Sequence, residues 1–177
     1  MKKVDYQKSI IVLIVFFVAI VAVDSYRLRT SLVTVNSSDT ISYDMAEVLK
    51  VIDGDTIEVL ISGHKEQIRF IGVNCPELND HYSEEAKRFT SNELLGKIVY
   101  MEKDTIDKDH YNRLLRYVWT RIPSSEDDNI TEMFNVKLLS EGYASILKIA
   151  PNDKYAAQFQ TIEKESQEKN KGIWELK

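Results

Sequence analysis

Two carboxylates flank a glycine in residues 51–56, which read Val-Ile-Asp-Gly-Asp-Thr. Asp53 and Asp55 stand between two apolar stretches that read as strands. Hard cations such as calcium bind several oxygen ligands, and a carboxylate pair at the end of a strand can supply some of them. An ordinary hairpin turn is the alternative, because Asp and Gly are common in turns for conformational reasons alone. Taken by itself, the segment favours the turn.

A rigid turn follows the third predicted strand, where residues 74–77 read Asn-Cys-Pro-Glu. Pro76 fixes the backbone and favours an extended Cys75, so that Glu77 projects from a firm support. A carboxylate held beside a metal ion can orient or deprotonate water. No particular base is suggested for Cys75, so we interpret this cysteine as an inert thiol rather than a nucleophile.

Two arginines share the face of a predicted strand with apolar residues, near the start of that strand. Arg69 alternates with Ile71 and Val73, and Arg113 alternates with Leu115 and the aromatic residues that follow. A guanidinium removed from water needs a carboxylate or a phosphate, and its planar fork suits both. The alternative is that both side chains simply reach solvent at exposed strand ends. One such arginine favours that alternative, whereas two leave the question open.

Composition excludes several classes of protein. The chain has 177 residues, of which 44% are apolar and 29% charged, so it can bury a core and is not wholly disordered. Its single cysteine excludes an intramolecular disulfide framework and a zinc site built on several thiolates. The formal net charge of −5 argues against a strongly basic nucleic-acid coat.

The N-terminus reads as a separate segment. Fourteen consecutive apolar residues, 10–23, follow three lysines, which is the pattern of an export signal. A bilayer span requires roughly 17–25 residues, so this run is short for one. We predict a signal anchor or a cleaved signal peptide over residues 1–24, a polar linker over 25–45 and a folded domain over 46–177. The domain is then expected outside the cytoplasm, anchored to the membrane or secreted.

The domain is predicted to hold five strands and three helices. The expected strands are 47–52, 56–61, 67–73, 97–102 and 113–121. A helix is expected to begin at Ser83, a short one to cover 135–141, and a last one to be capped by Asn152. Five short strands interrupted by a helix suit an α+β fold, a five-stranded OB-fold-like β-barrel with three helices outside it, preceded by an N-terminal hydrophobic helix.

These motifs together resemble the staphylococcal-nuclease-like (thermonuclease) family. Residues 52–56 resemble its first metal motif, 69–77 its arginine-to-glutamate strand and turn, and 109–113 the segment with its second arginine. Residues 135–142 and the closing 172–174 also match in kind and order. Each motif alone is weak, but their shared order and spacing over residues 47–176 make the resemblance strong.

The resemblance implies a calcium-dependent nuclease that hydrolyses phosphodiester bonds of DNA or RNA and leaves 3′-phosphate ends. It places Asp55, Asn74 and the carbonyl of Cys75 around the metal, with Asp53 and Thr56 supporting them. It gives Glu77 the attacking water and gives Arg69 and Arg113 the phosphate. It further implies substrate contacts from Tyr111 and Lys148 and a monomeric protein.

Two departures from the family pattern leave an alternative function open. Asn74 stands where the best-known members carry Asp, which predicts weaker calcium binding or another divalent ion. The substrate-side tyrosines are not evident in residues 145–151, where Lys148 and aliphatic residues stand instead. The alternative is a catalytically weakened module of the same fold that binds nucleic acid or protein without cutting.

Overall fold

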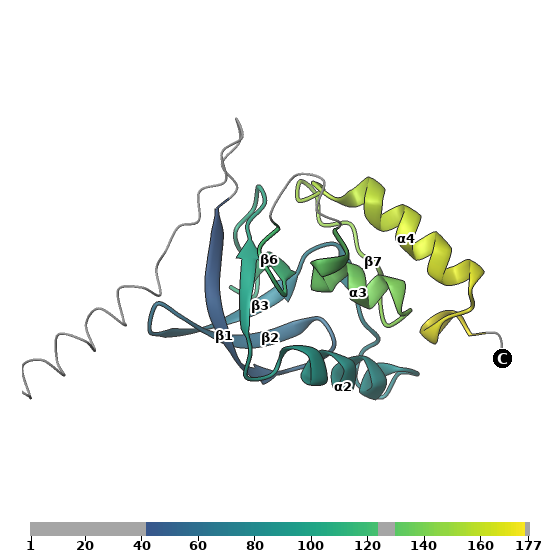
Figure 1. The fold of residues 1–177 in the computed structure, drawn as a ribbon, viewed down its shortest axis with the longest axis horizontal. Helices are drawn as coiled ribbons and strands as arrows, with labels where there is room; N and C mark the ends of the chain where they lie inside the picture. The colour runs from purple at the N-terminus through teal and green to yellow at the C-terminus, as the bar shows by residue number, and fades with distance from the viewer. Residues whose placement is uncertain (1–41, 124–129, 176–177) are drawn as a thin grey trace, which may run out of the picture. The chain divides into compact units, whose positions relative to one another are not determined.

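Strands of alternating polarity close into the predicted barrel (Figure 1). The structure, a computed structural model, describes residues 42–123 and 130–175. Within these residues the closed barrel has the order β1-β2-β3-β6-β5. Its strands are β1 (Tyr43–Val51), β2 (Thr56–Ile61), β3 (His64–Phe70), β5 (Ile98–Glu102) and β6 (Leu114–Trp119). The predicted barrel class is therefore confirmed.

The barrel closes because one face of each strand is buried. Ile57 and Val59 of β2 and Ile68 of β3 are fully buried, as period-two alternation requires of a strand with one face in a core. Phe70 at the end of β3 meets Phe134 edge to face, with ring centroids 5.9 Å apart. This contact joins the barrel core to the helical layer.

One parallel strand pair brings two distant segments together. β3 and β6 run side by side, with Arg69 opposite Leu115 in the register. Arg69 is thus the penultimate residue of β3, and Arg113 immediately precedes β6. The expectation that both arginines lie near strand starts is wrong for Arg69, because β3 begins at His64, three residues earlier than predicted. β3 also ends earlier than predicted, since Gly72 turns the chain at φ 79°.

After this turn the chain forms a small second sheet. β4 (Val73–Asn74) pairs antiparallel with β7 (Ser145–Ile146). The predicted strand 67–73 is therefore divided between β3, which begins at His64, and β4. This division matters for the site, because β4 is the support on which residues 74–77 are carried.

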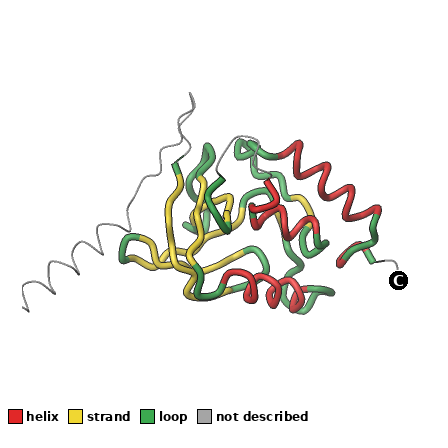
Figure 2. Tube along the Cα trace, viewed as in Figure 1, coloured by secondary structure: helices red, strands yellow, loops and turns green. Residues whose placement is uncertain are grey.

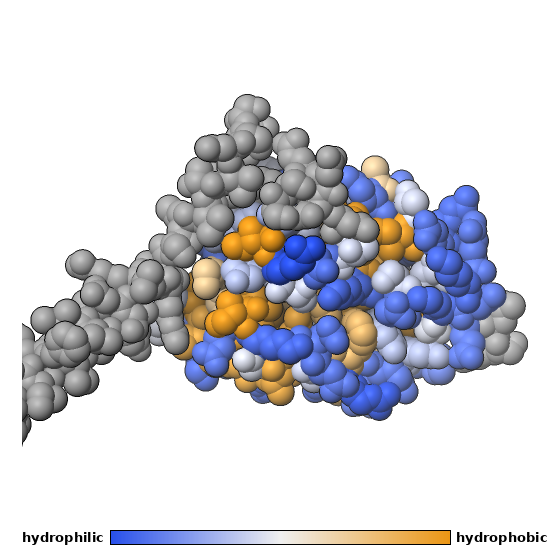
Figure 3. All heavy atoms as spheres, viewed as in Figure 1, coloured by the Kyte–Doolittle hydropathy of each residue, from blue (hydrophilic) through white to orange (hydrophobic). Residues whose placement is uncertain are grey.

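Three helices pack to one side of the barrel, as Figure 2 shows in red. They are α2 (Ser83–Leu94), α3 (Phe134–Ser140) and α4 (Ala156–Glu168). A short 3-10 turn, η2 (Ile130–Glu132), precedes α3, and another, η3 (Gly172–Trp174), follows α4. α3 lies between the barrel and α4 (Figure 1). Hydrophilic side chains cover α4 on the face drawn in Figure 3.

The side chains of two asparagines hydrogen-bond to the backbone of segments that are distant in the chain. Asn135 in α3 is fully buried; its Oδ1 accepts from the Val118 N–H at 2.9 Å and its Nδ2 donates to the Ile71 carbonyl at 2.8 Å. Asn152 does not cap α4, which begins at Ala156, so that prediction is wrong. Its side-chain amide instead exchanges two hydrogen bonds with the backbone of Ile106, at 2.7 and 3.0 Å.

The predicted export segment, residues 1–24, and the predicted linker up to residue 41 lie outside the described residues. β1 begins at Tyr43, three residues before the predicted start of the domain. In the part of the chain that the structure describes, no helix has the length and apolar character needed to cross a membrane.

A buried carboxylate ties the end of β5 to the start of the C-terminal helical region. Glu102 is only 2% exposed. Its Oε2 accepts from Trp119 Nε1 at 3.1 Å and from the Tyr155 hydroxyl at 2.9 Å, while Oε1 pairs with Lys154 Nζ. Tyr155 in turn meets Tyr117 edge to face at 4.7 Å between ring centroids. The Glu102 carboxylate is therefore the one acceptor that the Trp119, Tyr155 and Lys154 side chains share.

We predict that Glu102→Ala lowers the free energy of unfolding by about 3–5 kcal/mol, because it leaves the buried donors of this network without an acceptor. Urea denaturation followed by far-UV circular dichroism measures the change. Lys65→Ala, which breaks the exposed pair with Glu58 at 3.2 Å, is the control and should cost less than about 1 kcal/mol. Equal losses in the two variants would contradict a structural role for the Glu102 network.

Candidate active site

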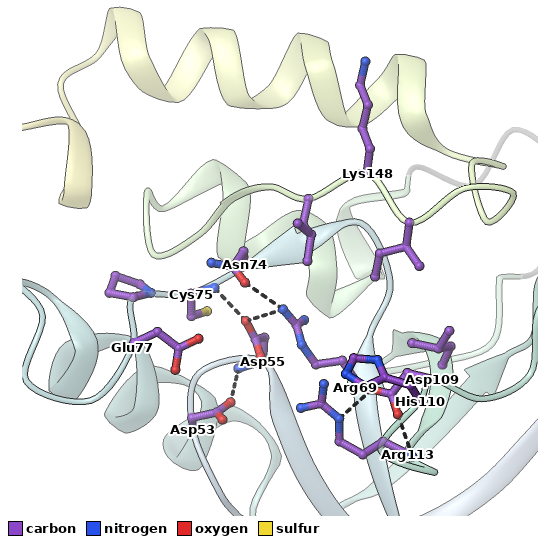
Figure 4. A pocket seen from close by; sticks show the side chains of 14 residues that line it. Asp53, Asp55, Arg69, Asn74, Cys75, Glu77, Asp109, His110, Arg113 and Lys148 are labelled. Atoms are coloured by element: carbon purple, nitrogen blue, oxygen red, sulfur yellow. Dashed lines mark hydrogen bonds and ion pairs between the residues drawn. The ribbon is translucent and has the colours of Figure 1, made fainter.

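A pocket of about 420 Å³ opens at the end of β3, beside the turn between β1 and β2 (Figure 4). It gathers side chains from four stretches of the chain. Most of the predicted site residues line it: Asp53, Asp55, Arg69, Asn74, Cys75, Glu77, Arg113 and Lys148. Thr56 and Tyr111 are the predicted site residues that do not.

The turn between β1 and β2 is fixed by a close approach of two segments. A Cβ atom at Gly54 would lie 2.6 Å from Cys75 Sγ, so only glycine fits there. Thr90 of α2 donates its hydroxyl to the Gly54 carbonyl at 2.6 Å. Asp53 Oδ1 accepts the backbone N–H of Asp55 at 3.0 Å. Helix α2 therefore helps to hold the first acidic motif in place.

Asp55 is the most constrained carboxylate of the pocket. It is 5% exposed, and its Oδ2 accepts the Cys75 N–H at 2.6 Å and pairs with Arg69 Nη2 at 3.2 Å. Thr56 donates its hydroxyl to Oδ1 at 3.1 Å, which is how Thr56 supports the site without lining it. Burial raises the pKa of Asp55 to about 6; Arg69 lowers it, and the nearby Asp53 charge raises it.

Arg69 uses both terminal nitrogens within the protein. Nη1 donates to the carbonyls of Phe70 and Val73 at 2.9 and 2.8 Å. Nη2 contacts Asp55 and donates to Asn74 Oδ1 at 2.9 Å. The guanidinium therefore joins β3, β4 and the first acidic motif.

Arg113 comes from a tight turn over residues 109–113. Asp109 Oδ1 accepts the backbone N–H groups of Tyr111 and Arg113 at 3.0 and 2.9 Å, and its Oδ2 accepts Arg113 Nε at 2.7 Å. Asn112 lies in the left-handed region, at φ 67°. The terminal nitrogens of Arg113 point into the pocket, on the side away from Asp109 (Figure 4).

The remaining predicted side chains lie at the edge of the pocket. Glu77 is exposed, and Figure 4 shows its carboxylate directed toward Asp55. The ammonium group of Lys148 points away from the acidic residues in the same view. Tyr111 is 70% exposed, with its ring centroid 5.3 Å from the guanidinium carbon of Arg113. Tyr111 therefore borders the arginine rather than the acidic cluster.

Asp109 and His110 line the pocket but were not predicted as site residues. The resemblance of segment 109–113 to the family predicts only Tyr111 and Arg113 as site residues. One signal does point to Asp109: Asp often accepts a hydrogen bond from the backbone N–H two residues later, which forms an Asx turn. No comparable signal marked His110.

The oxygen atoms near Arg69 fit a divalent cation in donor type. Asp55 Oδ2 and Asn74 Oδ1 already face one positively charged nitrogen, at 3.2 and 2.9 Å from Arg69 Nη2. Carboxylate and amide oxygens are ligands that hard cations accept. Among the residues that the structure describes, no group of three or more His, Cys, Asp or Glu side chains is placed to hold a metal ion. The candidate side-chain ligands for a divalent cation are thus one carboxylate, from Asp55, and one neutral amide, from Asn74.

Comparisons with known proteins point to one family. A family model described as "Staphylococcal nuclease homologue" matches residues 67–176. The chain is 40% identical over 134 residues to a thermonuclease of Staphylococcus intermedius and 38% identical over 134 residues to one of Staphylococcus hyicus, covering 72% of this chain and 74% of each relative. It is 32% identical over 133 residues to the endonuclease YncB of Bacillus subtilis (strain 168), covering 71% of this chain and 59% of that protein.

The pKa of Asp55 predicts a pH-dependent stability. Its value rises from 3.8 to about 6 on folding, so the protonated carboxyl stabilises the fold fully below the unfolded value, and this contribution is lost as the pH rises through 6. In the presence of chelator, the free energy of unfolding of the wild type should fall by on the order of 2 kcal/mol between pH 4 and pH 7. The Asp55→Asn variant, which has no carboxyl at this position, should not show this fall. Urea denaturation at a series of pH values measures both, and parallel pH profiles would contradict the expectation.

Proposed function

The chain belongs to the staphylococcal nuclease family, and we propose that it is a divalent-cation-dependent nuclease, with calcium the expected ion, acting through the pocket around Asp55. That it is a phosphodiester-hydrolysing enzyme follows from its thermonuclease and endonuclease relatives. The observation that supports the finer proposal is that five groups of matching chemistry line one pocket of about 420 Å³: Asp55, Asn74, Glu77, Arg69 and Arg113.

The two arginines suit a phosphodiester. During hydrolysis negative charge grows on the phosphoryl oxygens, and preorganised donors aimed at those oxygens lower the barrier. Arg69 and Arg113 reach the pocket from neighbouring strands of the barrel, because β3 and β6 are paired in parallel. Arg113 can therefore donate to the phosphate through its terminal nitrogens, whereas Arg69, whose terminal nitrogens are held by protein acceptors, contributes its positive charge at the same pocket.

Glu77 is the group proposed to orient or deprotonate the attacking water. Pro76 precedes it on the turn that follows β4, and Figure 4 shows its carboxylate directed into the pocket. Because Glu77 is exposed, water reaches it directly. A positioned carboxylate of this kind typically contributes about 10²- to 10⁴-fold to the rate.

Asp55 and Asn74, with the Cys75 carbonyl, are proposed to hold the cation. When bound, the ion would neutralise phosphate charge and polarise the reacting group. Arg69 Nη2 lies against both side-chain oxygens, so the arginine keeps them together before an ion arrives. Asp53, which holds the Asp55 backbone at 3.0 Å, supports the same loop.

Several finer properties are proposed from the sequence and its resemblance to the family. We propose DNA, RNA or both as the substrate, 3′-phosphate products, a monomeric protein and export through the apolar segment 10–23, either anchored or cleaved. The net charge of −5 offers little diffuse attraction to a polyanion. Binding is therefore expected to depend on the few cations at the pocket, including Lys148 at its edge.

We predict that cleavage of single-stranded DNA requires calcium and the side chains of Arg113 and Glu77. Chelator should abolish activity, Arg113→Ala should lower kcat by about 10³-fold, and Glu77→Gln should lower it by about 10²- to 10⁴-fold. Initial rates on a labelled oligonucleotide measure each effect.

Two surface variants serve as matched controls for these changes. Arg88→Ala on α2 and Glu58→Gln on β2 remove the same kinds of charge outside the pocket and should retain activity. Activity that ignores chelator, or that survives both pocket substitutions, would refute the proposed mechanism. A wild type that binds the oligonucleotide without turnover would favour the alternative of a non-cutting module.

The amide at position 74 predicts a weakened cation site that one substitution can strengthen. Asn74→Asp adds a carboxylate beside Asp55, and affinity for calcium rises with the charge of the ligand set. We expect calcium to bind at least about tenfold more tightly, as measured by isothermal titration calorimetry. Asn79→Asp adds the same charge on the exposed loop after Glu77 and should leave the affinity nearly unchanged. Equal affinity in wild type and Asn74→Asp would exclude residue 74 from the cation site.

A further inference from the structure

Asp109 is an acidic side chain in the pocket to which the proposed reaction gives no part. We propose that Asp109 is a positioning residue, which holds Arg113 in the one orientation that presents both terminal nitrogens to a phosphate. The inference rests on the proposed function, because it deepens the role of Arg113 in that same site. The evidence for it is that both carboxylate oxygens of Asp109 accept hydrogen bonds from the segment that carries Arg113.

One oxygen of Asp109 shapes the backbone. Oδ1 accepts the N–H groups of Tyr111 and Arg113 at 3.0 and 2.9 Å. The Asp109 backbone closes the same turn, since its N–H donates to the Arg113 carbonyl at 3.0 Å and its carbonyl accepts from Asn112 at 3.0 Å. These bonds set the direction in which Arg113 leaves the main chain, immediately before β6.

The other oxygen fixes the side chain. Oδ2 accepts from Arg113 Nε at 2.7 Å, which is the length of a charge-assisted hydrogen bond. Nε is the inner donor of the guanidinium, so this bond occupies one edge of the fork and directs the other outward. Within residues 42–123 and 130–175, neither terminal nitrogen of Arg113 has a hydrogen-bond partner, and Figure 4 shows both pointing into the pocket.

The charge on Asp109 is maintained by the arginine that it holds. Burial acts to raise the pKa of Asp109, but hydrogen bonds from the backbone and side chain of Arg113 hold that pKa below its ordinary value. The Arg113 side chain is about one quarter exposed. Without this anchor it would be free to turn toward solvent, and ordering it on a phosphate would cost side-chain entropy.

The two arginines of the pocket are therefore not equivalent. Arg69 has both terminal nitrogens engaged by protein acceptors. Arg113 has its inner nitrogen engaged and its outer pair available. A planar fork with two parallel N–H groups is what a phosphate accepts in bidentate fashion. Arg113 therefore provides the two terminal N–H groups for the phosphate, and Asp109 holds the guanidinium in the orientation that directs them into the pocket.

Asp109→Asn separates the two functions of the carboxylate. Its Oδ1 still accepts the two backbone N–H groups, but its amide nitrogen faces Arg113 Nε, a donor against a donor. Asp109→Ala removes both functions. Positioning predicts that Asp109→Asn lowers kcat by about 10- to 100-fold, changes KM less than about threefold and leaves the melting temperature near that of the wild type. Glu84→Gln, the same acid-to-amide change at an exposed position of α2, is the control.

A double-mutant cycle and a spectroscopic probe decide whether Asp109 acts through Arg113. In an Arg113→Ala background, Asp109→Asn should cost no more than about twofold in kcat, because the group that it positions is gone. The Nε–H resonance of Arg113 in ¹⁵N-labelled protein should be protected from exchange in the wild type and lose that protection in Asp109→Asn. Wild-type rates and an unchanged resonance in Asp109→Asn, or an equal loss of kcat in both backgrounds, would overturn the inference.

Failure of the proposed function gives a different result. If the wild type shows no turnover, the proposed nuclease mechanism fails, while the resonance and the affinity for a single-stranded oligonucleotide in chelator still test Asp109. Weaker oligonucleotide binding by Asp109→Asn, together with loss of protection, would then support positioning. Unchanged binding together with an unchanged resonance would refute it.

Discussion

The buried ion pair between Asp55 and Arg69 is the interaction on which the rest of the pocket depends. Both side chains are 7% exposed, and their charged atoms lie 3.2 Å apart. Because Arg69 Nη2 contacts both Asp55 and Asn74, each residue fixes the position of the segment that carries the other. Cys75 and Asn74 join the same cluster through hydrogen bonds of 2.6 and 2.9 Å. The candidate cation ligands and one of the two pocket arginines are thereby placed by one cluster of contacts.

Much of this arrangement could be predicted from the sequence, because its signals are local. Alternating polarity predicts the barrel strands, and the order of the motifs predicts the family and most of the charged residues that line the pocket. Local signals fail where tertiary contacts decide. β3 ends sooner than its alternation suggests because Gly72 turns the chain, and Asn152, a plausible helix cap, bonds to Ile106 instead.

The acidic residues were the hardest to interpret from the sequence. Glu102 and Asp109 resemble the many solvated carboxylates of a chain with 28 acidic residues. Only the fold shows that the first is enclosed by Trp119 and Tyr155 and that the second holds Arg113. The direction of the Lys148 side chain likewise could not be predicted. Sequence spacing places a residue on a segment, but it does not say whether its ammonium group points toward the acidic residues or away from them.

The parallel pairing of β3 with β6 has a consequence for when the protein acquires its chemistry. Arg69 and Arg113 become neighbours only through a contact between residues far apart in the chain, and such contacts form late because a long loop must first be closed. A newly made or partly unfolded chain has neither the paired arginines nor the Asp55 cluster. Cutting of nucleic acid therefore requires a molecule that has completed its barrel, and partial unfolding that separates β3 from β6 removes the activity.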